Sequence, residues 1–182
     1  MEAPLVADGL CIRPYVAEDL SEFVSAVRES MATVGVWMAW CREPYSTDDA
    51  RTWFEQCTAN LNAASAYDVG IFSADNGKFL GGIGINQLNR QQNFANIGYW
   101  VRQSCQRQGI ATRAVRAMAG YGFGALKFTR LEIVSAVDNR PSRGVAEKAG
   151  AVFECIARNR VVLHGRPLAA AVYSLIPGQP GN

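Results

Sequence analysis

Apolar residues recur every three or four positions in two segments of the first third of the chain, which predicts two amphipathic helices. The first stripe spans residues 20–31, and the second spans 50–61 behind Ser46, a residue type that caps helix N-termini. Trp53 falls on the second stripe, so we expect it to pack in the core. The segment between the stripes, V-G-V-W-M-A-W at 34–40, has no helical period and predicts a loop or a short helical piece.

Further along the chain the apolar residues alternate with polar ones, which predicts strands of a sheet. The expected strands cover residues 10–12, 67–72, 78–87, 95–101, 130–137, 152–163 and 168–176. Helices are predicted over 111–121 and 141–148, and Asn76-Gly77 is typical of a hairpin turn. The sequence therefore predicts an α+β fold, called α/β in some schemes, with a mixed, mainly antiparallel central sheet of about seven strands flanked by helices.

Length and composition fit one globular domain. The chain has 182 residues, 49% hydrophobic and 19% charged, so we expect a single domain over 1–182 with a flexible tail at 177–182. The net charge of +2 and the lack of a dense basic run argue against a nucleic-acid partner. No signal peptide and no run of about 18 apolar residues is found, which predicts a cytoplasmic protein without membrane association.

Cysteine and histidine usage argues against a metal site. The five cysteines are widely spread without a C-x-x-C pair. His164, the one histidine, falls in L-H-G-R-P, which is typical of an exposed hairpin turn. We therefore expect no metal cofactor, no disulfide framework and no histidine-based catalysis.

The glycines of L-G-G-I-G-I-N at 80–86 raise the question of a dinucleotide fold. Gln87 stands where G-x-G-x-x-G needs its third glycine, and the segment predicts strand throughout rather than a strand-to-helix turn. The NTPase loop G-x-x-x-x-G-K-[ST] is absent from the chain. Close packing or a β-bulge is the better explanation of these glycines.

The stretch from Asn96 to Thr112 begins as an alternating strand, passes through a polar loop and ends where a helix starts. The first backbone N–H groups of a helix have no partner within it, and together with the helix dipole they attract a phosphate. Gly109 lets the backbone approach a pyrophosphate closely, and the small Ala111 leaves the helix start uncrowded. The stretch therefore predicts a phosphate site, with a plain polar loop as the alternative.

The loop carries Q-R-Q-G-I-A at 106–111, which resembles the [QR]-x-x-G-x-[GA] signature of the GNAT acetyltransferase superfamily in the same strand-loop-helix setting. Y-W-V before the loop, L-C-I-R-P-Y near the N-terminus and D-N-R-P-S-R-G-V-A-E-K-A-G at 138–150 are similar to further family motifs, in family order over nearly the whole chain. V-W-M-A-W at 36–40 resembles the Rim-type branch, which acetylates protein N-termini and some small amines. The resemblance implies a GNAT-like acyl-CoA N-acyltransferase fold and direct transfer of acetyl from acetyl-CoA to an amine.

The resemblance also implies which residues bind acetyl-CoA. They are Trp100, Val101, Gln106, Arg107, Gln108, Gly109, Ile110, Ala111, Thr112, Asn139 and Ser142. The pyrophosphate is expected on the backbone N–H groups of 108–112, with Arg107 or Arg113 adding charge. The pantetheine is expected along the preceding strand, where a backbone N–H near Val101 polarises the thioester carbonyl. Asn139 is expected to form a hydrogen bond with the pantetheine amide, or else to be only a turn residue that follows a strand. Ser142 is expected to protonate the CoA thiolate, or else to be only a residue in the first turn of a helix.

Three positions depart from the family pattern. Ala146 stands where many members carry a tyrosine that protonates sulfur, Asn96 where members often carry a glutamate base, and Val161 where some Rim-type enzymes carry one. The remaining candidate bases, each with a surface or capping role as the alternative, are Glu43, Asp48, Asp68 and Glu154. An α-amino group has a pKa near 8 against about 10 for lysine, so it needs less help from a base, which favours a protein N-terminus as acceptor.

Trp37 and Trp40 either line the acceptor cleft or pack in the core, and the same two alternatives exist for Trp53, whose apolar stripe favours the core. Two classes of function stay open: an acetyltransferase acting on protein N-termini or small amines, and a catalytically silent module that binds acyl-CoA. Similar proteins commonly form dimers, so a homodimer is a further expectation. The sequence does not identify the acceptor or the general base.

Overall fold

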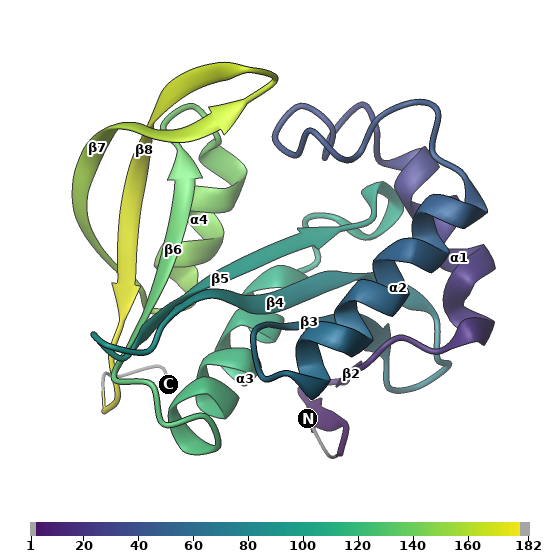
Figure 1. The fold of residues 1–182 in the computed structure, drawn as a ribbon, viewed down its shortest axis with the longest axis horizontal. Helices are drawn as coiled ribbons and strands as arrows, with labels where there is room; N and C mark the ends of the chain where they lie inside the picture. Colours follow the sequence, from purple (N-terminus) through teal and green to yellow (C-terminus); the bar gives the residue numbers. More distant parts are fainter. Residues whose placement is uncertain (1–2, 179–182) are drawn as a thin grey trace.

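The computed structural model describes residues 3–178, so most of the predicted tail at 177–182 lies outside the described residues. Within them, one mixed sheet carries helices on both faces (Figure 1). The strands are β1 (Leu5–Ala7), β2 (Leu10–Arg13), β3 (Tyr67–Ser73), β4 (Phe79–Asn89), β5 (Phe94–Val101), β6 (Arg130–Ala136), β7 (Val152–Leu163) and β8 (Arg166–Leu175). The helices are α1 (Leu20–Glu29), α2 (Thr47–Asn62), α3 (Ile110–Gly124) and α4 (Arg140–Lys148), with short 3-10 turns at Ala17–Asp19 and Gln103–Cys105.

The strand order is β1-β2-β3-β4-β5-β6-β8-β7, and each neighbouring pair is antiparallel except β5 and β6. The predicted α+β fold with a mainly antiparallel sheet is therefore confirmed. The sheet has eight strands rather than about seven, because β1 was not predicted. A strand of three residues is too short to show an alternating period.

Local sequence explains the ends of the helices. Ser46 caps α2: its Oγ accepts a hydrogen bond from the Asp49 N–H at 3.1 Å, and the Asp49 carboxylate accepts one from the Ser46 N–H at 2.7 Å. α3 continues to Gly124, past the predicted end at residue 121, although each of its three glycines costs about 1 kcal/mol relative to alanine within a helix. Gly122 is required there, because a Cβ would lie 2.9 Å from side-chain carbons of Ile85 and Leu131.

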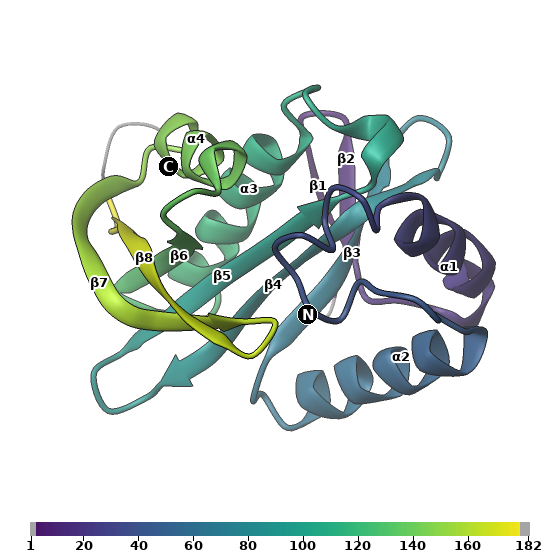
Figure 2. The same ribbon diagram turned by 90° about the horizontal axis from the view of Figure 1, so that it is seen from above.

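The sheet separates two layers of helices. α1 and α2 cover one face, and α3 and α4 lie on the other (Figure 2). One apolar cluster lies on the α3 side and includes Ile97 and Met118, and a second lies under α1 and α2 and includes Phe23, Phe54 and Phe79. No helix within residues 3–178 is long and apolar enough to cross a membrane.

The sheet opens between β5 and β6. These parallel strands pair only at Phe94–Asn96 and then diverge (Figure 1). The Arg102 N–H donates to the Leu80 carbonyl of β4 at 2.9 Å. In an antiparallel ladder every second residue forms hydrogen bonds with the neighbouring strand, so Trp100 also faces β4. Tyr99 and Val101, which alternate with these residues, therefore direct their backbone N–H and C=O groups away from β4 and into the gap between β5 and β6.

Candidate active site

A groove of about 740 Å³ occupies the gap between β5 and β6 and extends to the start of α3. It is lined by most of the residues predicted to bind the cofactor: Trp100, Val101, Gln106, Arg107, Gly109, Ile110, Ala111, Thr112, Asn139 and Ser142. Gln108 does not line it, and the Arg113 guanidinium donates to the Asp8 carbonyl instead. Arg140 and Lys148 on α4 also line the groove, although their positions in the sequence gave no sign of it.

The start of α3 has the geometry of an anion site. Gly109 precedes the helix with a φ of +72°, and a Cβ on it would meet no atom within 4 Å. The N–H groups of Ile110, Ala111 and Thr112 belong to the first turn and have no acceptor within the helix. These donors and the positive helix end border the groove, so a phosphate placed there is held without a side chain.

The loop that leads to α3 is held rigidly. The buried Arg102 guanidinium donates to both carboxylate oxygens of Glu29 on α1, at 2.7 and 3.1 Å, and the Ser104 N–H and hydroxyl donate to the same carboxylate. The hydrogen bond from Arg102 is the main reason that the pKa of Glu29 falls to about 2. Gln106 donates its amide to the Val101 carbonyl at 3.0 Å and to Thr33 at 3.1 Å, so this residue positions the loop.

Asn139, Ser142 and Tyr99 also line the groove, and Ser142 contacts both of the others. Asn139 caps α4, and its Oδ1 accepts from the Ser142 N–H at 3.1 Å. The Tyr99 hydroxyl donates to the Ser142 carbonyl at 2.9 Å and lies 3.1 Å from Ser142 Oγ. Burial raises the pKa of Tyr99 to about 12, so it stays protonated at neutral pH. The sequence predicts Tyr99 only as part of an alternating strand and its Y-W-V motif, because Tyr99 and Ser142 lie 43 positions apart along the chain.

A second cavity, of about 580 Å³, lies under α2. Its floor has few side chains, because Gly82, Gly84 and Gly98 lie on one face of β4 and β5. Its walls are largely aromatic and include Tyr15, Phe23, Trp40, Tyr45, Trp53 and Trp100. Met38, Tyr99 and Trp100 line both hollows, so the second cavity and the groove lie next to each other at β5. The predicted close packing of the glycines is confirmed, since a Cβ on Gly82 would lie 2.6 Å from Trp100 Nε1.

Comparison with known families assigns the fold. Residues 9–152 match the family model described as an acetyltransferase (GNAT) domain. The chain belongs to the GNAT acetyltransferase family. The Bacillus subtilis (strain 168) protein YdaF, to which a ribosomal N-acetyltransferase activity is ascribed, is 29% identical over 179 residues, covering 94% of this chain and 93% of YdaF.

Solved GNAT structures superpose over nearly the whole chain. A Vibrio cholerae protein described as a ribosomal-protein-serine acetyltransferase has a TM-score of 0.84 and 32% identity, covering 97% of this chain and 98% of its own. RimL, a ribosomal L7/L12 α-N-protein acetyltransferase solved with coenzyme A, has a TM-score of 0.86 and 21% identity, covering 95% and 97%. These neighbours are of the Rim type that the sequence resembles, and RimL binds CoA on the same fold.

The tryptophans of this GNAT chain do not behave alike. Trp40 is 41% exposed and lines the second cavity, whereas Trp37 lines the groove. The prediction that Trp53 packs in the core was wrong: it is 37% exposed and faces the second cavity, while its neighbour Phe54 is buried. The glycine floor opposite α2 leaves space below Trp53 that a helical period does not reveal.

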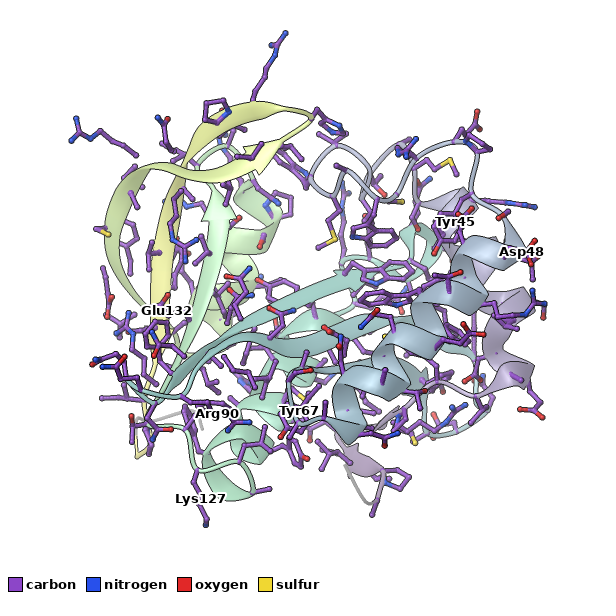
Figure 3. All side chains as sticks on the ribbon, viewed as in Figure 1. Tyr45, Asp48, Tyr67, Arg90, Lys127 and Glu132 are labelled. Carbon is purple, nitrogen blue, oxygen red and sulfur yellow. The ribbon has the colours of Figure 1, made fainter. Side chains whose placement is uncertain are left out.

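Of the four carboxylates considered as bases, one lines a cavity. Asp48 is exposed and points outward from the start of α2, beyond Tyr45 (Figure 3), and Glu43 is also exposed. Glu154 is engaged by Arg130 at 2.6 Å, which lowers the pKa of Glu154 to about 2. Asp68 lines the second cavity, and burial raises the pKa of its carboxyl group. No cluster of His, Cys, Asp and Glu suited to a metal ion is found within the described residues.

Proposed function

We propose that this protein transfers the acetyl group of acetyl-CoA to the α-amino group of a protein N-terminus. The observation that carries the proposal is the junction of two hollows at Tyr99 and Trp100. A thioester arriving along the groove and an amine arriving through the second cavity meet there. Holding two reactants together in this way removes much of the entropic cost of their reaction.

The groove is suited to CoA along its length. The pyrophosphate binds the N–H groups from Gly109 to Thr112, and Arg107, Arg140 and Lys148 add positive charge. The pantetheine follows the free edge of β5 as an added strand would, and Asn139 offers its amide N–H₂ to it because its oxygen already caps α4. RimL, which has the same fold, is known with CoA bound.

The thioester is activated by the backbone and its leaving group by a hydroxyl. The Val101 N–H faces the gap and donates to the thioester carbonyl as negative charge develops on its oxygen. Ser142 Oγ gives a proton to the departing CoA thiolate. The Tyr99 hydroxyl donates to the Ser142 carbonyl and lies 3.1 Å from Ser142 Oγ, so it orients this serine.

The acceptor class is inferred from relatives and from amine chemistry. YdaF and the Vibrio cholerae protein are both described by their ribosomal-protein substrates. An α-ammonium group, with a pKa near 8, loses its proton far more readily than a lysine side chain near 10. A cavity of about 580 Å³ admits the first residues of a peptide, and it also admits a small amine, which is the alternative acceptor.

The proposal is tested by thiol release from acetyl-CoA with three acceptors: a peptide with a free N-terminus, the same peptide blocked at its N-terminus but containing lysine, and a panel of small amines. We expect turnover with the free N-terminus and little with the blocked peptide. Turnover on small amines alone would instead support the small-molecule acetyltransferase. Tight acetyl-CoA binding without turnover on any amine would refute the enzyme and indicate the silent acyl-CoA-binding module.

The proposal also includes a cytoplasmic location, where acetyl-CoA and ribosomal proteins occur together, and a homodimer, which follows from similarity to dimeric proteins. The dimer is tested by sedimentation or light scattering. It predicts a mass about twice the 19.8 kDa of one chain, and a mass of one chain at micromolar concentration would contradict it.

A further inference from the structure

The second cavity contains a carboxylate that no cation neutralises. Asp68 on β3 forms no ion pair within residues 3–178, and it accepts a hydrogen bond from Asn86 Nδ2 at 3.2 Å. Arg42, the arginine of this cavity, acts electrostatically on Asp49 instead. A partly buried carboxylate is costly to ionise unless a cation approaches it, so this cavity favours a positively charged occupant.

The strand register brings this carboxylate close to the junction of the two hollows. Asp68 is paired with Gly84 on β4, and Gly84 is paired with Gly98 on β5. A Cβ on Gly84 would overlap Asp68 Oδ1, so the carboxylate oxygen lies directly over the middle strand. Neighbouring strands are about 4.8 Å apart, which leaves one strand spacing between the carboxylate and β5. A bound amine, or an amine and one water, spans that distance.

Aromatic rings surround the space in front of Asp68. Trp40 and Trp100 stand edge to face with centroids 5.4 Å apart, Tyr45 lies 6.4 Å from Trp40, and Trp53 closes the wall from α2. The faces of such rings attract cations, and they exclude water from the acceptor. A carboxylate among aromatic rings is the arrangement that recognises a primary ammonium group.

A chain of amides fixes the orientation of the carboxylate. Asn96 Nδ2 donates to Asn86 Oδ1 at 3.0 Å, so the Asn86 oxygen is occupied and its N–H₂ faces Asp68. Asn96 stands where GNAT enzymes often carry a glutamate. In this chain the residue at that position instead supports a carboxylate two strands away.

We propose that Asp68 binds the ammonium group of the acceptor and serves as its general base. This inference rests on the proposed function. Asp68 takes one proton from the ammonium, and the neutral amine attacks the thioester carbon, so that a C–N bond forms and the carbonyl electrons move to oxygen. The carbonyl then re-forms and the C–S bond breaks. The thiolate takes the proton of the Ser142 hydroxyl, and solvent then restores a proton to Ser142. The nitrogen releases its second proton to solvent and Asp68 passes on the first, so two protons leave, one returns, and the net release is one proton per acetyl transferred.

Asp68 is the carboxylate of this cavity that is left for a ligand, because Asp49, which also lines the cavity, accepts hydrogen bonds from the Ser46 N–H and hydroxyl at the start of α2. Tyr15 and the Cys57 thiol on α2 both interact with Asp68, and burial is the main reason that the pKa of each is raised, so both are neutral at pH 7. Tyr45, whose pKa burial raises to about 12, is also neutral. Burial raises the pKa of Asp68 as well, which makes it a stronger base than an exposed carboxylate.

The test compares Asp68→Asn with Asp75→Asn, an exposed carboxylate in the β3–β4 turn, across pH 5.5 to 9 with a peptide that has a free N-terminus. We expect Asp68→Asn to lower kcat/KM at pH 7 on the order of 100-fold, with an unchanged Kd for acetyl-CoA. The kcat/KM of the wild type is expected to rise with pH and to reach a plateau above the pKa of Asp68. The variant is expected to keep gaining activity up to the pKa of the amine, near 8, because it reacts only with neutral amine. Asp75→Asn is expected to match the wild type.

A second variant tests the same assignment without removing the carboxylate. Asn86→Asp places a like charge beside Asp68 and keeps the acceptor for Asn96, so we expect the acidic limb of the pH profile to move upward by about one unit. Unchanged acetyl-CoA affinity shows that both variants are folded. An Asp68→Asn enzyme with the rate and pH profile of the wild type overturns this inference while the acetyltransferase stands. A wild type that binds acetyl-CoA but acetylates nothing overturns both.

Discussion

The phosphate site proposed at the start of α3 can be tested quantitatively, because the chain contains a matched pair of glycines. Gly109 has a φ of +72° and Gly77, in the β3–β4 turn, has a φ of +71°. Neither would bring a Cβ within 4 Å of another atom. Replacement by alanine therefore strains the left-handed backbone equally at the two positions, without a clash. We expect each substitution to lower the free energy of unfolding by about 1 kcal/mol. In a domain of this size that loss lowers Tm by about 2–4 °C in both variants.

Only one of the two glycines borders the groove. In Gly109→Ala the new methyl group occupies space where the pyrophosphate approaches the N–H groups of α3. Loss of one hydrogen bond to a charged group costs about 1.5–3 kcal/mol, which corresponds to about 10- to 100-fold in Kd. We expect Gly109→Ala to weaken acetyl-CoA binding by that factor, and Gly109→Glu to abolish it through repulsion between charges.

Calorimetric titration with acetyl-CoA, alongside thermal unfolding without ligand, separates the two effects. Gly77→Ala is expected to lower Tm like Gly109→Ala and to keep the wild-type Kd. Equal Kd values for wild type, Gly77→Ala and Gly109→Ala would show that the pyrophosphate lies elsewhere.

Three further predictions concern the acid, the acceptor wall and the loop. Ser142→Ala is expected to lower kcat about 10-fold or more and to leave the Kd for acetyl-CoA unchanged. An unaltered kcat would show that water, rather than Ser142, protonates the CoA thiolate. Trp53→Ala is expected to raise the KM for the peptide and to change the stability only slightly. The adjacent Phe54 is only 8% exposed, so Phe54→Ala is expected to lower the free energy of unfolding in urea by about 3–5 kcal/mol. Equal losses of stability in the two variants would show that Trp53 packs in the core. The pKa of Glu29 is lowered to about 2, so its ion pair stabilises the fold fully above the unfolded pKa near 4.5 and loses that effect as pH falls toward 2. Glu29→Gln is therefore expected to be less stable than the wild type at pH 7 and to approach it at pH 2.5, and a constant difference across that range would contradict the assignment.

The parts of this molecule that depend on neighbouring residues could be predicted from the sequence. The Ser46 cap, the turn at Asn76-Gly77 and the helix that begins after Gly109 each involve residues within a few positions of one another. Local periodicity and turn chemistry contain that information. The backbone geometry at the start of α3, on which the proposed phosphate site depends, was predicted for the same reason, whereas Arg113 turns away from the groove to the Asp8 carbonyl.

The acceptor half depends on contacts between distant residues. Asp68 meets Asn86 and Gly84 only because β3 and β4 pair in one particular register, and the Ser142 hydroxyl meets a tyrosine 43 positions earlier. Trp53 follows a helical period that correctly predicts α2, yet the surface opposite it is glycine, so the period does not bury it. No local pattern specifies such combinations, because they arise from the pairing of strands.

In the proposed mechanism, acetyl-CoA lies in the gap between β5 and β6 and presents its thioester to the second cavity. A crystal structure with CoA bound would show whether it does. We predict the pyrophosphate on the N–H groups of Gly109 to Thr112, the pantetheine along the free edge of β5, and the sulfur within hydrogen-bonding distance of Ser142 Oγ, facing Trp100. CoA bound outside this gap, or bound with its sulfur directed away from the second cavity, would contradict the account.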